Sequence, residues 1–444
     1  MDPFIIGLLG VILLLALLVF GTHVGIALSI AGFIGVAFLS GFEQSIFMTA
    51  SAIYHKISIP ALITLPLFIL MGFLASGGGI SKNLYDSLNL WLGKFRGGLG
   101  ISTVMACAAF GTVCGSSIVT TAVFAKISAP EMRKHGYSKE LAYAICAAAG
   151  SIGMLIPPSI LAIVYGMLSG VSIGKVLMAG VAPGILWGIA FSVAIIITGK
   201  IKPSSIKYVP MGKVTWYQRF ASLKLWWPIF IVSFVTFGGI YGGVFTPSEG
   251  AAVAAFVLFA IYIALILKRK SLKGSQKFDE LHSMMKDTAT TSGMIFLIMG
   301  ASTVFSNFLV LTGVTTKIST LIQGWELSPS VLVIFISFIY LVLGCFLEGI
   351  SMLCITIPVF NPIINAAGVD PIWYATIVIT SVEIGLITPP VGLNLYAANG
   401  VAEADVRLED IISGIVPFFI AELICLIILF SFPPISTFLP SFIG

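Results

Sequence analysis

The feature of this sequence that most restricts its fold is a series of apolar runs about as long as a membrane is thick. The first run extends from Phe4 to Phe20, and comparable runs follow as far as residue 431. A helix needs about 20 apolar residues to cross a bilayer, whereas a barrel strand needs about 10 alternating ones. The chain is also only 9% charged, against about 25% in soluble domains. The sequence therefore predicts an all-α polytopic membrane protein.

Two of the apolar runs are too long and too interrupted to be single spans. Residues 98–129 contain "GTVCGSS" in their middle, and residues 329–365 contain "GCFLEGIS". Each run has room for two short helices, so we interpret both as re-entrant hairpins whose tips stop inside the membrane. Simple crossings or broken helices are expected near 4–20, 24–40, 60–76, 140–169, 175–198, 224–241, 248–267, 290–311, 371–400 and 409–431.

The basic residues divide unevenly between the two sides of this topology. Twenty of the 23 Lys and Arg residues fall on one side, and only Lys56, Lys175 and Lys317 fall on the other. Cytoplasmic loops carry such an excess of basic residues. We therefore expect the basic side to lie in the cytoplasm and both termini to lie outside. Residues 204–223, which mix basic and aromatic side chains, are expected to form a cytoplasmic interfacial arm, with a plain basic loop as the alternative.

Short matches between the two halves of the chain indicate an internal duplication. They occur in the same order at an offset of about 230 residues, which is typical of a repeated unit. The matching pairs are "GMLIPPSI" (153–160) with "GLITPPVG" (385–392), "LFILMG" (67–72) with "IFLIMG" (295–300), and "VAPGIL" (181–186) with "IVPFFI" (415–420).

The span count predicts that the two repeats have opposite orientations in the membrane. Each repeat contains five crossings and one hairpin, and an odd number of crossings turns the second copy upside down. We expect the first inverted repeat at 1–203, with its broken helix at 140–169. The second is expected at 224–444, with its broken helix at 371–400.

Each repeat places two adjacent prolines inside an apolar run. Proline removes a backbone donor and clashes with the preceding turn, so both helices should break there. Broken helices at membrane depth are tolerated where protein or a water-filled cavity satisfies the backbone, and many secondary transporters are built from inverted repeats that contain them. The freed amides would suit an anion, and the freed carbonyls would suit Na⁺. The pattern predicts a secondary transporter.

The candidate binding residues are the small, polar and proline residues at the hairpin tips and breaks. Close helix packing is the alternative reading for the serines and glycines. Acids inside a membrane are rare and usually functional. Glu348 could ligate a cation, cap hairpin amides or carry a proton, and Glu383 could instead pair structurally with the hairpin. Substrate binding is expected at Gly115, Ser151, Pro157, Pro158, Ser159, Glu348, Ser351, Glu383, Pro389, Pro390, Gly392 and Asn394.

These motifs together resemble the large membrane subunit of the tripartite ATP-independent periplasmic (TRAP) transporters. The resemblance runs from about residue 4 to 431 and is carried by "GTVCGSSIVTT", "GSIGMLIPPSI", "FLEGISMLCITIPVFNPI" and "EIGLITPPVGLNLY". It implies Na⁺-driven uptake of an organic acid, such as a C4-dicarboxylate or sialic acid. It also implies a multi-pass protein of the bacterial inner membrane, so that both termini would lie in the periplasm. The substrate would come from a periplasmic binding protein, and a small four-span membrane subunit would brace the large one.

The resemblance also implies a transport motion and two sets of Na⁺ ligands. The hairpins and broken helices would slide as an elevator against a scaffold of the remaining spans. One departure is Glu348, because this family often has Asp at the second hairpin tip. The implied Na⁺ ligands are Ser116, Ser117, Gly150 and Gly153 in one site and Gly349, Thr380, Gly385 and Thr388 in the other.

Two other functions fit parts of the pattern. A self-sufficient Na⁺/carboxylate symporter could share the inverted-hairpin architecture and would transport without partners. A membrane-embedded enzyme is disfavoured, because the midplane acids lack neighbouring His, Cys or metal-ligand residues in the sequence and no catalytic or nucleotide motif is present. We therefore expect no enzymatic activity, no nucleic-acid partner, and Na⁺ as the only bound ion.

Overall fold

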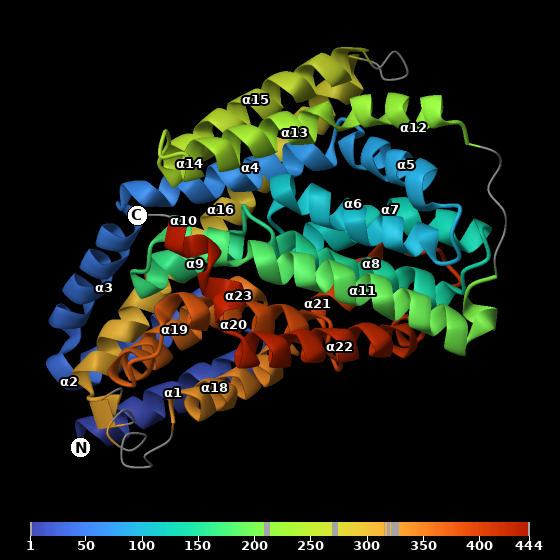
Figure 1. Cartoon of the computed structure of the whole chain (residues 1–444). Helices are drawn as coiled ribbons and strands as arrows, with labels where there is room; N and C mark the ends of the chain where they lie inside the picture. The colour runs from blue at the N-terminus through green and yellow to red at the C-terminus, as the bar shows by residue number, and fades with distance from the viewer. Residues whose placement is uncertain are drawn as a thin grey trace.

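The chain is a bundle of helices, most of which have their axes roughly aligned (Figure 1). The computed structural model describes residues 2–207, 214–268, 274–314, 316, 317, 320 and 328–442. Within these residues the only β pairing is an isolated bridge between Tyr137 and Ile206. The predicted all-α fold is thus confirmed. Residues 208–213 of the expected arm lie outside the described residues.

Membrane-length helices are present in the number that a polytopic protein needs. Among the described residues, six helical stretches are long and apolar enough to span a membrane, or eight if each of two bent pairs is one span. The helices of the N-terminal half are α1 (Pro3–Val19), α2 (Val24–Ser40), α3 (Phe42–Ile57), α4 (Thr64–Ser76), α5 (Ile80–Leu92), α6 (Gly98–Cys114), α7 (Ser117–Lys134), α8 (Lys139–Leu155), α9 (Ile160–Ser169), α10 (Ile173–Ala179) and α11 (Val181–Ile201).

The C-terminal half continues with the same kinds of element. A π-helical turn at Phe234–Gly238 joins α13 to α14. The helices are α12 (Trp216–Leu223), α13 (Trp227–Ser233), α14 (Gly239–Tyr241), α15 (Pro247–Lys268), α16 (Gly274–Leu311), α18 (Pro329–Gly344), α19 (Gly349–Ala366), α20 (Pro371–Leu386), α21 (Leu393–Gly400), α22 (Leu408–Ser431) and α23 (Pro434–Thr437).

Helix pairs occupy both predicted hairpins. In the first, Gly115 ends α6 in the left-handed region (φ +64°), where a glycine avoids the strain of a side chain, and α7 begins at Ser117. In the second, residues 345–348 connect α18 to α19. α7 extends to Lys134, beyond the predicted end at 129. That the tips stop inside the membrane stays a prediction.

Both proline pairs interrupt a helix, as their chemistry requires. α8 ends at Leu155 and α9 begins at Ile160, with a bend of 44° between them. α20 ends at Leu386, and α21 begins only at Leu393. The two X–Pro bonds inside the pairs are both cis.

Sequence reasoning missed two helices and the start of a third. α3 contains Glu43 and Lys56, and α5 is amphipathic, so neither forms an apolar run that a membrane-span criterion detects. α16 begins at Gly274, well before the predicted span at 290–311, because its first turns are polar. α3 and α4 form a pair bent by 60°.

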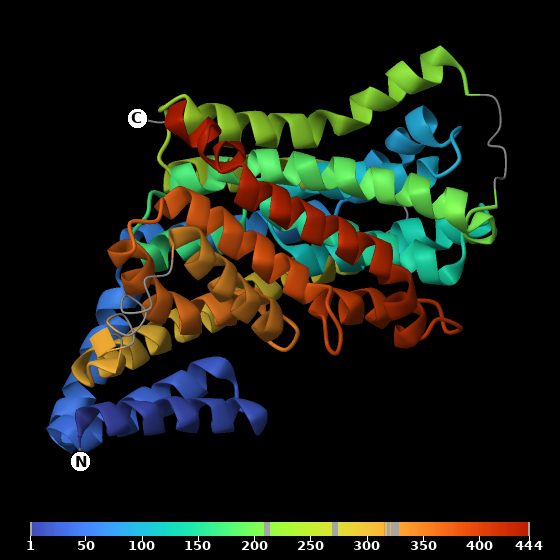
Figure 2. The same cartoon turned by 60° about the horizontal axis from the view of Figure 1, so that its bottom comes forward.

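The helices pack in two groups that Figures 1 and 2 show from two sides. In one group α16 contacts α2, α3 and α4, and α4 also contacts α15. In the other, α8 contacts α6, α7, α11 and α22, and α18 packs on α20. Every residue of 141–155 in α8 and of 373–386 in α20 is buried. The two proline-broken helices therefore form the core of the second group.

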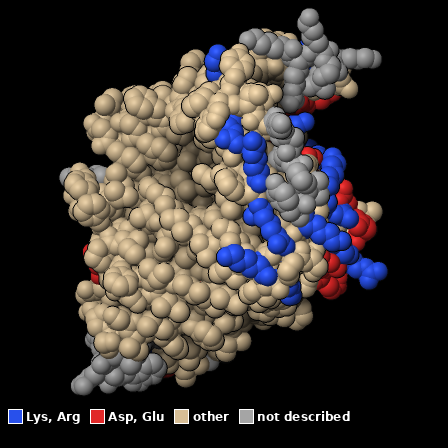
Figure 3. Space-filling model, turned by 45° about the vertical axis from the view of Figure 1, so that its right-hand side comes forward, with Lys and Arg blue, Asp and Glu red and all other residues tan. Residues whose placement is uncertain are grey.

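Charged side chains gather at one end of the molecule. Figure 3 shows lysines and arginines along one edge of a face that is otherwise almost free of charge, with acidic residues beside them. This separation fits a protein that exposes apolar sides to lipid and one basic end to water. The side of the membrane on which this end lies stays a prediction.

Candidate functional site

The helices α7, α9 and α19 begin at a hairpin tip or after a break, and a polar side chain caps the N-terminus of each. The hydroxyls of Ser116 and Ser159 accept hydrogen bonds from first-turn amides of α7 and α9, at 3.5 and 3.2 Å. The carboxylate of Glu348 accepts the amides of Ile350 and Ser351 at 3.1 Å each, and the Ser351 hydroxyl at 3.0 Å. Of the three roles considered for Glu348, the structure thus shows amide capping.

Each hairpin tip is hydrogen-bonded to the break of its own half. The Gly115 carbonyl accepts the amide of Ile160 at 3.3 Å. The Cys345 carbonyl accepts the amide of Gly392, also at 3.3 Å. Ile160 and Gly392 both stand two positions after the second proline of their pair. The two halves therefore use the same backbone contact to hold a hairpin tip against a break.

Glycines allow each hairpin to approach its broken helix at backbone contact. A Cβ atom added to Gly111 would lie 2.4 Å from the Cα of Gly153. A Cβ added to Gly385 would lie 2.6 Å from the Cα of Gly344. Cβ atoms do not approach backbone this closely, so both pairs require glycine. Gly344 is a functional candidate that sequence reasoning missed, although its offset from Gly111 matches that of the predicted repeat.

The close approach at Gly385 predicts a loss of stability in the Gly385→Ala variant. We expect the free energy of unfolding to fall by about 1–3 kcal/mol, because the new methyl group overpacks against the α18 backbone. Thermal unfolding of the purified protein in detergent measures this change. Gly188→Ala in α11 is the matched control, since its Cβ would meet nothing within 4 Å and alanine favours a helix. Equal melting temperatures of the two variants would contradict the contact.

Side chains join the two halves of the chain at the breaks. The Ser117 hydroxyl donates to Oε1 of Glu383 at 3.4 Å, across 266 positions of sequence. The amide of Asn394 donates to the Ser151 hydroxyl at 3.3 Å, across 243 positions. The first contact links the first hairpin tip to α20, and the second links α8 to α21. The structural pairing considered for Glu383 is therefore present.

Polar oxygens are left over in this buried region. Oε2 of Glu383 and Oδ1 of Asn394 are buried and accept no hydrogen bond from the described residues. Both carboxylate oxygens of Glu422, on α22, are also buried and accept no hydrogen bond from the described residues. A buried carboxylate oxygen without a partner is costly and is normally met by a proton, a water molecule or a cation. The region can therefore chemically accommodate a small cation.

The predicted Na⁺ ligands have oxygens around them. A Cβ on Gly150 would lie 3.0 Å from the Ser117 carbonyl oxygen and closer still to Oγ1 of Thr121, a residue that sequence reasoning missed. The hydroxyls of Thr380 and Thr388 donate to carbonyls one turn earlier in the chain, at 2.7 and 2.6 Å. Because these hydroxyls use their protons within the chain, they can meet a further partner only as acceptors, as a cation requires.

The structure brings the predicted residues to four neighbouring places but does not bury them equally. Pro157 and Pro158 are buried, whereas Pro389 and Pro390 are exposed. The residues lie at the first hairpin tip (Gly115, Ser116, Ser117), around the first break (Gly150, Ser151, Gly153, Pro157, Pro158, Ser159), at the second tip (Glu348, Gly349, Ser351) and around the second break (Thr380, Glu383, Gly385, Thr388, Pro389, Pro390, Gly392, Asn394).

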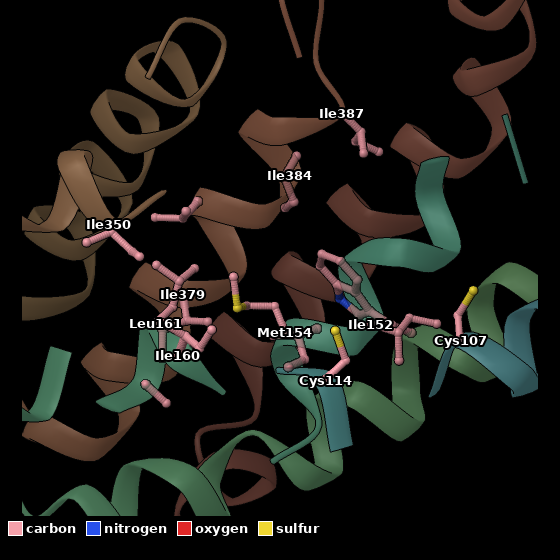
Figure 4. Close-up of a cluster of buried hydrophobic side chains, with 14 of the residues drawn as sticks. Cys107, Cys114, Ile152, Met154, Ile160, Leu161, Ile350, Ile379, Ile384 and Ile387 are labelled. Carbon is pink, nitrogen blue, oxygen red and sulfur yellow. The ribbon is translucent and has the colours of Figure 1, made fainter. Parts of the chain in front are cut away.

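Apolar side chains from both halves pack between these places. Figure 4 shows Leu161 of α9 with Ile350 of α19 and Ile379 of α20 in one buried cluster. A cavity of about 10 Å³ lies beside this cluster, lined by Ser159 and Thr376 among others. That volume is close to the minimum for one water molecule. The site is therefore tightly packed, and this cavity has room for one occupant of about the size of a water molecule.

The chain matches one protein family over almost its whole length. Residues 11–435 match the family described as "Tripartite ATP-independent periplasmic transporter, DctM component". A C4-dicarboxylate TRAP transporter large permease protein of Pseudomonas aeruginosa is 34% identical over 385 residues, which cover 86% of this chain and 87% of that protein. An ectoine TRAP transporter large permease protein of Halomonas elongata is 30% identical and covers 96% and 97%.

A third relative is longer than this chain. It is the isethionate TRAP transporter permease protein DctMQ of Oleidesulfovibrio alaskensis, 31% identical, with 95% of this chain and 64% of that protein covered. Among solved structures, the YdaH transporter of Alcanivorax borkumensis aligns with a TM-score of 0.59 at 12% identity, over 88% of each chain. MtrF of Neisseria gonorrhoeae aligns at 0.58 and 14% identity, over 89% and 85%. These two structural similarities indicate a similar fold and nothing more.

Proposed function

Because the chain belongs to the DctM component family of the TRAP transporters, we propose that it is the large membrane subunit of a Na⁺-coupled importer of an organic acid. Membership in this family makes it a multi-pass protein of the bacterial inner membrane and a transport permease rather than an enzyme. Na⁺ coupling, the substrate class and the elevator motion are the parts that we propose.

The observation that carries the proposal is the matched contact of each hairpin with its break. Both tips bond to the second position after a proline pair, and both hairpins meet their broken helix through a glycine pair. Each half thus holds its hairpin against its break in the same way, and the two halves are joined by Ser117 with Glu383 and by Ser151 with Asn394, so that they form one junction. Such paired breaks are how secondary transporters hold substrate and ions at membrane depth.

Na⁺ coupling is supported by the kind of atoms that the junction offers. The surrounding groups are carbonyls, hydroxyls and a carboxylate, and Oε2 of Glu383 is a buried acceptor to which no described residue donates. Interrupted helices supply carbonyl ends for Na⁺ and amide ends for anions. We propose that Na⁺ is held by the two sets of residues that the family resemblance implies, which are Ser116, Ser117, Gly150 and Gly153 in one site and Gly349, Thr380, Gly385 and Thr388 in the other. The carboxylate of the substrate would then be met by the helix N-termini beside them.

An elevator motion is supported by contacts that tie the end of the first hairpin to the loop that follows the second broken helix. Arg133, at the end of α7, bonds to Glu403 and Asp405 in the loop after α21, with 2.6 Å between Nη2 and Oδ2 of Asp405. The hydrogen bond from Arg133 holds the pKa of Asp405 below its usual value. We propose that hairpins and broken helices move as one body.

The relatives support partners but do not select a substrate. Their names refer to C4-dicarboxylate, isethionate and ectoine TRAP transporters. The longer relative, named DctMQ, is consistent with a second membrane component that is separate from this chain. We propose a periplasmic substrate-binding protein and a small four-span subunit as partners, and an organic acid, such as a C4-dicarboxylate or sialic acid, as the cargo.

Reconstitution in liposomes tests this function. The chain would be combined with a small subunit and a binding protein of this family from the same organism, and uptake of radiolabelled organic acids would be measured. We expect uptake only when all three proteins are present, because the family works through a delivered substrate. Each two-component mixture is a control. Uptake by the chain alone would instead favour the self-sufficient symporter, and no uptake by the complete system with any acid would contradict the proposal.

A further inference from the structure

An apolar groove runs between α11 and α22 on the side of the molecule. It encloses about 840 Å³, and its walls are formed by both helices. Ile189 and Val193 on α11 and Ile420 and Ile424 on α22 line it, and each exposes about half of its surface. In a membrane protein, side chains of this kind on the outside face acyl chains. Apart from its polar end, the groove offers no hydrogen-bonding group that would position a polar ligand.

Two opposite charges stand at one end of this groove. Glu140, in the first turn of α8, and Lys202, at the end of α11, both line it. Among the described residues neither has an ion-pair partner, whereas the neighbouring Lys139 is paired with Asp410. Ser138 and Ser205 add hydroxyls at the same end. The groove is thus apolar along its length and carries an unpaired acid and an unpaired base where it ends.

We propose that this groove binds a phospholipid with an ethanolamine head group. The acyl chain would lie between α11 and α22, with the phosphate on Lys202 and the primary ammonium on Glu140. A phosphate is a strong acceptor for lysine, and a primary ammonium has donors for a carboxylate. A head group with both charges satisfies both residues at once. A purely anionic head group would place its charge beside Glu140, and a quaternary choline has no N–H to donate.

The test is the lipid content of the protein purified from membranes in mild detergent, with any subunit that stays bound. Bound lipids would be extracted and quantified by mass spectrometry for the wild type, Glu140→Gln and Lys202→Gln. We expect phosphatidylethanolamine to be enriched over its share of the membrane, and to fall at least fivefold in both variants. Lys200→Gln is the matched control, because Lys200 is an exposed base in the last turn of α11 that does not line the groove.

A second measurement separates the head group from general lipid binding. Delipidated protein would be titrated with phosphatidylethanolamine, phosphatidylglycerol or phosphatidylcholine, and its melting temperature followed. We expect the first lipid to raise the melting temperature most, and Ala194→Phe, which fills the groove, to remove that increase. Preference for phosphatidylglycerol, with retention that rises in Glu140→Gln, would overturn the proposal in favour of an anionic lipid. Equal retention in all variants would overturn it in favour of unspecific solvation.

Discussion

A disulfide between cysteines introduced by Thr112→Cys and Ser233→Cys is expected to stop uptake almost completely, and its reduction is expected to restore uptake. Thr112 lies on α6, in the first hairpin, and Ser233 ends α13, in the expected scaffold. Their hydroxyl oxygens are 2.8 Å apart, so the two Cβ atoms can reach the separation of about 4 Å that a disulfide needs. If the hairpin slides along α13 in each cycle, a covalent bond between them arrests it.

A second hydroxyl pair provides the control for this crosslink. Ser87 on α5 and Ser222 on α12 lie 2.7 Å apart, and both helices are outside the hairpins and broken helices. A disulfide made by Ser87→Cys and Ser222→Cys should therefore leave uptake unchanged. The six native cysteines are buried, which limits competing crosslinks. Full uptake with the first disulfide completely formed would argue that the hairpin and α13 do not move relative to each other.

The elements that the sequence predicted well are those with a local signal. The two proline pairs break helices where they stand, because a proline blocks the preceding turn whatever packs around it. The turn after α6 follows from a glycine that can adopt a positive φ. By contrast, α5 buries one face and exposes the other, so its pattern falls below any membrane-span criterion. Amphipathic helices need a helical-period criterion instead.

The sequence predicted which segments meet in the candidate site but not which side chains contact each other there. The repeat indicated that tips and breaks would meet, but the partners of particular side chains depend on packing between segments that are far apart in sequence. Ser117 with Glu383 is such a pair. The sequence left three roles open for Glu348, and only the geometry shows that its carboxylate caps the start of α19. Thr121 was missed because nothing local separates it from an ordinary helix residue.

Uptake by the complete transporter is expected to fall to background when Na⁺ is replaced by K⁺, and to be unaffected by ATP depletion while the Na⁺ gradient is held. Ser116→Ala and Thr388→Ala are expected to raise the Na⁺ concentration for half-maximal uptake about tenfold, which corresponds to about 1.4 kcal/mol of lost Na⁺ binding. Each substitution removes a hydroxyl oxygen next to a hairpin tip or a break. Initial uptake rates over a Na⁺ titration measure the change.

Thr303→Ala separates an ion ligand from an ordinary helix threonine. Thr303 and Thr388 both donate to the carbonyl one turn earlier, at 3.1 and 2.6 Å, but Thr303 lies on α16, away from the breaks. Loss of this hydrogen bond and of the hydroxyl lone pairs is therefore common to both variants, and only the place of the hydroxyl, at the second break for Thr388, distinguishes them. A normal Na⁺ titration in Thr388→Ala would show that this threonine packs the break without holding the ion. A shifted titration in Thr388→Ala alone would place Na⁺ at the second break.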